Sequence, residues 1–260
     1  MSASHPDAGR AYPSRRIVGT RIDAASASEV TELVFEWTRG AAARYVCVCT
    51  VHMVMEGHDD HAFQSVVNGA DLVTPDGVPL VWCLRMLGVE RAARVHGPWL
   101  LPFLCEEAAR RNVPVGFYGG EPSVMRDLIA NLRSRAPTLD VAYQYCPPFR
   151  PLTTQEDADV VREIAASRTR ILFVGLGCPR QERWMAEHKH ALPLVMLGVG
   201  AAFDFVSGYK REAPMWIQQL GLGWLFRLLC EPRRLWWRYL YHNPRFIGLF
   251  ARQLLAGRGA

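Results

Sequence analysis

The chain has 260 residues, half of them hydrophobic and 21% charged, which excludes an intrinsically disordered protein and suits one large domain, alone or with an appendage. No apolar run reaches the roughly 18–20 residues that cross a bilayer, and the opening residues lack the hydrophobic segment of a secretory signal. The formal net charge of +5 is unevenly distributed along the chain.

Residues 1–16 are expected to form a flexible N-terminal arm, followed by a body over residues 17–205. In the body, short β-rich apolar segments alternate with helical patterns, which predicts an α/β fold with a mostly parallel sheet flanked by helices. Strands are predicted at 44–50, 71–74, 114–118, 139–145, 170–175 and 193–199. Helices are predicted at 52–67, 78–88, 98–112, 121–135, 154–168 and 179–190.

Residues 206–260 are expected to form a helical appendage, with helices at 213–229 and 232–256. Residues 216–258 hold seven arginines and one acidic residue, a net charge of +6, together with many aromatic residues. Arg227, Arg234 and Arg238 would share one face of a continuous helix. Arginines beside aromatic rings favour a membrane surface or a phosphate-rich ligand, although the aromatics would equally suit a packing face.

Polar residues and glycines follow the predicted strands, and in open α/β sheets ligands bind beyond the carboxyl ends of the strands. The candidates are Thr50 and His52, Asp76, Gly119 and Gly120, Gly177 with Arg180 and Gln181, and Asp204. Asp76, in T-P-D-G, is either a turn residue or a general base. The glycine loops lead into helices, whose N-termini suit a diphosphate, but simple strand-to-helix turns have the same pattern. Arg180 and Gln181 would equally suit a solvated surface, and His52 a half-buried structural position.

No strong metal site is predicted. The single D-x-D motif, Asp157 to Asp159, and the run from His58 to His61 both fall within predicted helices. The seven cysteines form no C-x-x-C pair and mostly lie in apolar segments, which favours buried, reduced thiols.

In order, the segments TPDGVPLVW, RVHG, YGGEPSVM, VGLGCPRQERWM and GVGAAFDFVSGYKREAP…EPRRLWWRYL resemble the WecG/TagA/CpsF family of glycosyltransferases. The resemblance runs from about Ile17 to the C-terminus. It implies a Rossmann-like body with a helical appendage that transfers a sugar from UDP to a polyprenyl-diphosphate-linked saccharide with inversion. The family often transfers N-acetylmannosamine or its uronic acid, and some members transfer glucose. Neither a metal nor another cofactor is expected.

The resemblance also suggests roles for individual residues. Asp76 matches the proposed catalytic base, while Thr50, Arg94 and Gln181 match active-site polar positions, and Asp204 a nucleotide contact. The appendage arginines (227, 234 and 238) match residues proposed to reach the diphosphates. The chain departs from the family at His52, where asparagine is usual, at Pro98-Trp99, where Asp-Leu is usual, and at Gly223, where glutamate is common.

The expected partners are a UDP-sugar, a lipid-linked acceptor and, through the appendage, the inner face of the plasma membrane, with a homo-oligomer possible and no nucleic acid. A non-catalytic nucleotide-sugar-binding or scaffold protein is the alternative function. A nicotinamide-dependent dehydrogenase fits poorly, because the chain lacks a complete G-x-G-x-x-G fingerprint. DNA binding by the basic tail would predict salt-sensitive retention that UDP does not relieve.

Overall fold

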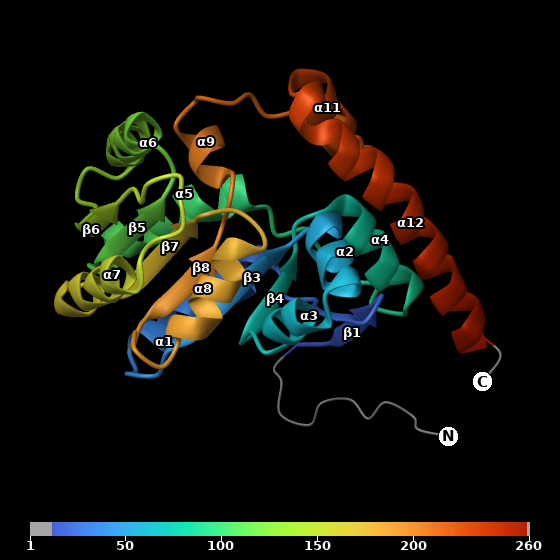
Figure 1. Ribbon diagram of the computed structural model, residues 1–260, viewed down its shortest axis with the longest axis horizontal. Coiled ribbons are helices and arrows are strands. Elements are labelled where there is room, and N and C mark those ends of the chain that lie inside the picture. Colours follow the sequence, from blue (N-terminus) through green and yellow to red (C-terminus); the bar gives the residue numbers. More distant parts are fainter. Residues whose placement is uncertain (1–11, 259–260) are drawn as a thin grey trace.

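A six-stranded parallel sheet forms the centre of the structure, a computed structural model that describes residues 12–258 (Figure 1). The strands lie in the order β4-β3-β8-β7-β5-β6. Their bounds are β3 Arg44–Cys49, β4 Leu72–Pro75, β5 Val115–Gly119, β6 Val141–Tyr145, β7 Ile171–Gly175 and β8 Val195–Gly198. The α/β, Rossmann-like fold is therefore confirmed, and all six predicted strands are present within two residues of their expected bounds.

Helices cover both faces of the sheet (Figure 1). Their bounds are α1 Ala27–Thr38, α2 Val51–Asp59, α3 His61–Asn68, α4 Val78–Met86, α5 Gly97–Arg110, α6 Pro122–Arg135, α7 Thr154–Ala166, α8 Arg180–His188, α9 Ala202–Val206, α10 Met215–Gln219, α11 Gly223–Cys230 and α12 Pro232–Arg258. Residues on α1, α5, α6 and α9 belong to one hydrophobic cluster, and residues on α2, α3, α4, α7, α8 and α12 to the other.

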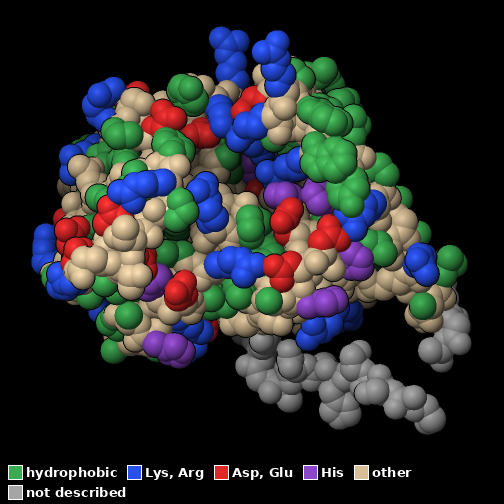
Figure 2. Space-filling model, viewed as in Figure 1, with side chains coloured by type: hydrophobic (Ala, Val, Ile, Leu, Met, Phe, Trp, Pro, Cys, Tyr) green, Lys and Arg blue, Asp and Glu red, His purple; other side chains and the backbone are tan. Residues whose placement is uncertain are grey.

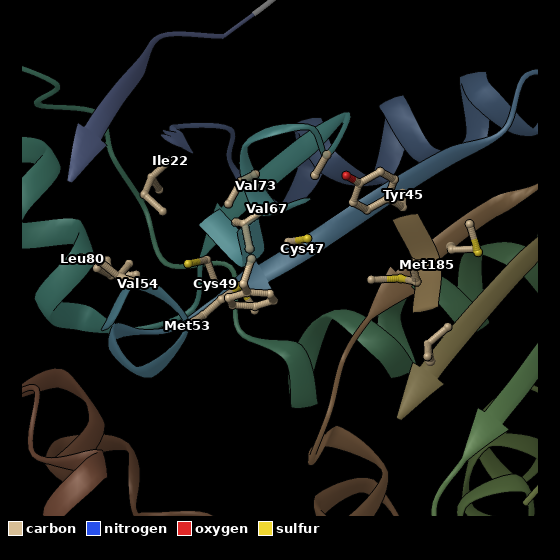
Figure 3. Packing of buried hydrophobic residues seen from close by; sticks show 14 of the residues in the cluster. Ile22, Tyr45, Cys47, Cys49, Met53, Val54, Val67, Val73, Leu80 and Met185 are labelled. Carbon is tan, nitrogen blue, oxygen red and sulfur yellow. The ribbon is translucent and has the colours of Figure 1, made fainter. Parts of the chain in front are cut away.

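Strand β3 shows why its sequence is apolar throughout. Tyr45, Cys47 and Cys49 belong to one cluster, and Val46 and Val48 to the other, so both faces of the strand are buried. Figure 3 shows part of the first cluster around β3. The buried cysteines, like the other cysteines of the chain, are free thiols, as predicted.

Two predicted helices are each interrupted. The helix expected at 52–67 is α2 and α3, because Asp60 is extended and its carboxylate accepts the backbone N–H groups of Ala62 and Phe63. The helix expected at 213–229 is α10 and α11, separated by Gly221 with a φ of +72°. A β-carbon at Gly221 would lie 2.7 Å from the Trp82 ring, so this turn requires glycine.

The region before β3 is more ordered than predicted. Strands β1 (Ser14–Ile17) and β2 (Thr20–Asp23) form an antiparallel hairpin, and α1 follows with a capping box between Ser26 and Glu29. The expected arm over residues 1–16 is therefore wrong at its end, because backbone pairing with β2 orders the chain from Ser14. Its first part, residues 1–11, lies outside the described residues.

The appendage folds back on the body through its last helix. Phe246 and Phe250 of α12 are buried in the first cluster, and α12 lies beside α2 (Figure 1). The expected division after residue 205 falls inside α9, which packs on α5 and α6. Over residues 12–258, the structure contains no helix with the length and apolarity that a membrane crossing demands.

Candidate active site

The carboxyl ends of the central strands carry most of the predicted residues. Thr50 and Asp76 directly follow β3 and β4, and Gly177 and Gln181 follow β7. The register aligns these ends, with Cys49 opposite Pro75 and Val174 opposite Gly198. The convergence predicted from the strand ends is therefore present in the structure.

Asp76 is the centre of a polar cluster. Its Oδ1 lies 2.8 Å from His96 Nδ1 and 3.3 Å from an Arg94 terminal nitrogen, and Arg94 Nε donates to the Asp76 carbonyl. The backbone N–H of Val95 donates to Pro75 O at 2.9 Å, which holds the segment from 94 to 96 against the end of β4. Asp76 and Arg94 were predicted from the sequence, whereas His96 was quoted only as part of a motif.

The segment leading to the appendage adds two further residues to this cluster. Arg94 donates to Gln218 Oε1 at 2.7 Å, and His96 Nε2 lies 3.7 Å from Glu212 Oε2. Both partners follow α9 and lie more than 115 residues from His96 along the chain. The segment after the body therefore completes the surroundings of Asp76.

The charges favour an ionised Asp76. Burial raises its pKa, but His96, Arg94 and Arg227 together outweigh burial and hold the pKa below its ordinary value. Burial lowers the pKa of His96, and Asp76 and Glu212 outweigh it in turn, so that this pKa is raised. A protonated His96 donates from Nδ1 to Asp76, whereas the neutral ring with a bare Nδ1 accepts from Arg94 at 2.7 Å. A carboxylate that stays ionised beside a titratable histidine suits general acid–base chemistry.

His96→Asn is expected to lower the melting temperature by a few degrees near pH 5.5 and by less near pH 9. Because the pKa of His96 is raised in the folded state, its contribution to stability is complete below the pKa of 6.5 in the unfolded chain. This contribution is lost as the pH rises through the pKa of the folded state. Because the pKa of Asp76 is lowered in the folded state, its contribution to stability is complete above the pKa of 3.8 in the unfolded chain. This contribution is lost as the pH falls through the pKa of the folded state. The ion pair therefore contributes most between about pH 4 and 6.5.

Thermal unfolding of wild type and variant from pH 4 to 9 measures this difference. His190→Asn, an exposed histidine, is the control and should track the wild type at every pH. A difference in melting temperature between wild type and His96→Asn that stays constant or increases with pH would contradict the assigned ion pair.

Thr50 and His52 open α2 and have different surroundings. Thr50 caps the helix, accepting the Met53 N–H at 3.4 Å, so the N-terminus of α2 faces the end of β3. His52, the second residue of the helix, lies against the appendage, with its ring centroid 5.3 Å from that of His242. Burial, followed by the charge of Arg238, lowers the pKa of His52 to about 3, so this imidazole is neutral.

Gln181 is buried, so the alternative prediction of a solvated surface position is wrong for this residue. Its Oε1 accepts the Gly177 N–H at 3.2 Å and its Nε2 donates to Glu182 at 2.6 Å. A β-carbon at Gly198 would lie 3.1 Å from Gln181 Nε2, so glycine at the end of β8 lets the amide approach. Burial raises the pKa of Glu182 to about 7, opposed by hydrogen bonds from Gln181 and backbone. Arg180, by contrast, is exposed.

Gly119 and Gly120 lie farther from Asp76. Strands β4 and β5 are four positions apart, about 19 Å at the usual strand spacing. Beyond β5, a cleft of about 480 Å³ between α6 and β6 is lined by Met125, Arg126 and Tyr145 among others. At about 24 Å from β4 it lies outside the Asp76 cluster. Only an elongated ligand would contact both Asp76 and the Gly119–Gly120 loop.

Asp204 and the appendage arginines differ in their availability to a ligand. Asp204 pairs with Lys210 at 2.6 Å, and Arg234 pairs with Glu231 at 2.7 Å and is more than half exposed. Arg227 and Arg238 each have a buried Nε without a hydrogen-bond partner among the described residues. Figure 2 shows basic side chains around the hollow between the appendage and the body.

Reasoning from the sequence missed His96, Glu212, Gln218 and Glu182. His96 and Glu182 lie in the quoted motifs RVHG and PRQE, and Glu212 in KREAP, so the signal for these three was present. Gln218 lies in the same segment as Glu212, between KREAP and EPRR, but nothing in the sequence links it to Arg94, 124 residues away.

Comparison with known proteins gives concordant matches. The model of the glycosyl transferase WecG/TagA/CpsF family matches residues 15–260. The N-acetylglucosaminyldiphosphoundecaprenol N-acetyl-beta-D-mannosaminyltransferase of Bacillus spizizenii is 26% identical over 227 residues, covering 87% of this chain and 86% of its own. The protein of the same name from Bacillus subtilis is 27% identical over 188 residues, covering 72% of this chain and 71% of its own.

Proposed function

The chain belongs to the WecG/TagA/CpsF family of glycosyltransferases, and from this premise we propose that it transfers a sugar from a UDP-sugar to a polyprenyl-diphosphate-linked saccharide with inversion. The ionised Asp76 at the end of β4, bonded to His96 and Arg94, is the observation that carries this proposal. Both relatives are named as N-acetylmannosaminyltransferases, which favours N-acetylmannosamine over its uronic acid or glucose.

Asp76 is the proposed general base. The acceptor hydroxyl attacks the anomeric carbon of the donor, its proton passes to Asp76, and the electron pair of the broken C–O bond leaves with UDP. His96 and Arg94 hold the carboxylate in place, since both contact Oδ1. Because the acceptor hydroxyl attacks in a single step from the face opposite the departing UDP, the configuration at the anomeric carbon is inverted.

The departing diphosphate requires positive charge, and we expect the protein to supply it without a metal. Arg227 and Arg238 are available for this role because each has an Nε without a partner in the part of the chain that is described. The N-termini of α2 and α8 add backbone N–H groups at the same sheet edge. The 19 Å between β4 and the Gly119–Gly120 loop suits an elongated nucleotide-sugar.

The direct test of the acceptor is the mass of the lipid product. Full-length protein incubated with UDP-N-acetylmannosamine and a short-chain polyprenyl-diphosphate N-acetylglucosamine should add one N-acetylhexosamine to the lipid. Formation of product from UDP-glucose, and not from UDP-N-acetylmannosamine, would show that glucose is the transferred sugar. Tight UDP binding without any product would favour a scaffold function.

We further propose that the appendage binds the inner face of the plasma membrane. Twelve of the seventeen large hydrophobic side chains that are exposed among the described residues lie between Met215 and Leu255. Figure 2 shows hydrophobic side chains gathered over α11 and α12 beside basic ones. Aromatic rings with arginines suit the headgroup region of anionic membranes.

The double variant Trp236→Gln/Trp237→Gln is expected to lower the affinity for anionic vesicles by at least about tenfold, because both exposed indoles would be lost from the interface. Sedimentation with phosphatidylglycerol vesicles measures the change. Trp99→Gln, which removes a body tryptophan of similar exposure (49%, against 51% and 57%), should leave binding unchanged. Equal losses from both substitutions would place the membrane contact elsewhere.

A further inference from the structure

Three side chains meet where the appendage packs on the body. His52 and Glu56 lie one turn apart on one face of α2, and His242 reaches them from α12. One ligand atom of each residue lies within 4.8 Å of one from each of the others. The helices lie side by side in Figure 1, and Arg245 pairs with Asp59 one turn farther along both.

The distances are too long for hydrogen bonds and suit ligands of one ion. His52 Nδ1 and His242 Nε2 lie 3.6 Å and 3.7 Å from the same oxygen, Glu56 Oε1. Nitrogen and oxygen ligands bind zinc at about 2.0–2.2 Å, so two ligands at a tetrahedral angle are about 3.3–3.5 Å apart. A contraction of a few tenths of an ångström would bring each histidine nitrogen to this spacing from Glu56 Oε1. The ligand atoms of the two histidines lie within 4.8 Å of each other, so a small rotation of the rings would complete the shell.

Each imidazole has a nitrogen without a hydrogen-bond partner. His242 is buried and His52 is half-buried, and Nδ1 of each ring has no hydrogen-bond partner among residues 12–258. Buried polar nitrogens ordinarily have a partner, so His52 Nδ1, the atom that lies toward Glu56, needs an explanation. A metal binds the neutral imidazole, in which the ligating nitrogen carries no proton.

We propose that His52, Glu56 and His242 bind one zinc-class divalent cation that joins α2 to α12. Two imidazoles and one carboxylate are a donor set typical of zinc with an open fourth position, and not of magnesium, which prefers oxygen ligands. The ion links the body to the appendage and so holds the appendage arginines against the body. No hydrogen bond or ion pair within the described chain joins the three residues to Asp76, so zinc binding does not depend on the proposed transfer reaction.

The surrounding charges set the affinity of this site. Arg238 faces His52 and opposes a cation, whereas Glu56 and Asp59 are acidic. Asp59 is held by Arg245, which leaves Glu56 as the unpaired carboxylate beside the histidines. Glu56 therefore supplies most of the negative charge that a single bound cation requires. Replacing Glu56 should weaken zinc binding as much as replacing one of the histidines.

Calorimetric titration of metal-stripped, tag-free, full-length protein with zinc chloride tests the site. One zinc ion should bind per chain, and excess magnesium should not displace it. His242→Asn and Glu56→Gln should each weaken zinc binding by at least about 10–100-fold, the loss typical even for outer partners of metal ligands. Cobalt substituted for zinc should give the visible absorption of a four-coordinate ion, and both variants should lose it.

His61→Asn is the matched control, because this exposed histidine lies at the start of α3, outside the cluster. It should bind zinc as the wild type does. Zinc should also raise the melting temperature of the wild type and of His61→Asn, but not of the two ligand variants, whose own folding is checked without metal. No stoichiometric binding, or equal binding by wild type and a folded Glu56→Gln variant, would overturn the site.

Discussion

Replacing Asp76 with asparagine is expected to lower acceptor-dependent turnover by about 10²–10⁴-fold, the contribution typical of a positioned general base. The amide has nearly the same shape but does not accept a proton at neutral pH. In the wild type the neighbouring cations depress the pKa of Asp76, so the carboxylate is already ionised there. The loss should therefore appear in turnover, while UDP binding, measured by calorimetry, stays within a few-fold of the wild type.

The control for this substitution is Asp127→Asn, since Asp127 is an exposed aspartate on α6 that pairs with Arg126 at the surface. It should retain wild-type turnover. Because Asp76→Asn also removes the partner of His96, its melting temperature and UDP affinity must be measured alongside. Near-wild-type turnover by a folded Asp76→Asn protein would place the base elsewhere.

Arg227→Gln and Arg238→Gln are each expected to lower turnover by about 10²–10³-fold, the loss typical when one preorganised group that stabilises developing charge is removed. Both guanidinium groups face the body. Arg227 helps to depress the pKa of Asp76, and Arg238 contributes to the depressed pKa of His52. Steady-state UDP release with saturating donor and acceptor measures the effect.

Two other arginines of α12 are the controls. Arg233 is exposed, so Arg233→Gln removes the same charge without touching the body. Arg234 is already paired with Glu231 at the surface, where ion pairs contribute at most about 1 kcal/mol, so Arg234→Gln should cost less than about tenfold. Equal losses from Arg227, Arg233 and Arg238 would show a general effect of tail charge instead of a diphosphate contact.

The body was predictable because most of its strands are buried on both faces. The apolar runs of β3, β4, β5, β7 and β8 have no exposed residues to mask them, whereas the edge strand β6 carries the exposed Gln144, and helical patterns separate the strands. Strands β1 and β2 carry charged residues, Arg15 and Arg16 in β1 and Arg21 and Asp23 in β2, so they lack such an apolar pattern. The break between α2 and α3 depends on one capping aspartate, Asp60, within an otherwise helical sequence.

The site was predictable only in part. Asp76 and Thr50 follow strands directly, and Gln181 lies at the start of the helix after β7, so the topology alone brings them to one edge. His242 reaches the body on α12, which packs back through Phe246 and Phe250, and Glu212 and Gln218 reach it from the segment between α9 and α11. No pattern in the chain gives the direction of that return, so their contacts could not be inferred.

The central claim, acceptor-dependent transfer from a UDP-sugar, is tested most directly by UDP release from purified full-length protein. The assay would use a panel of UDP-sugars with and without short-chain polyprenyl-diphosphate-linked saccharides, and no added divalent cation. We predict release with one preferred donor, UDP-N-acetylmannosamine, that rises sharply when acceptor is present. Measurable UDP binding with no acceptor-stimulated release from any donor would contradict the transferase mechanism and favour a binding or scaffold protein.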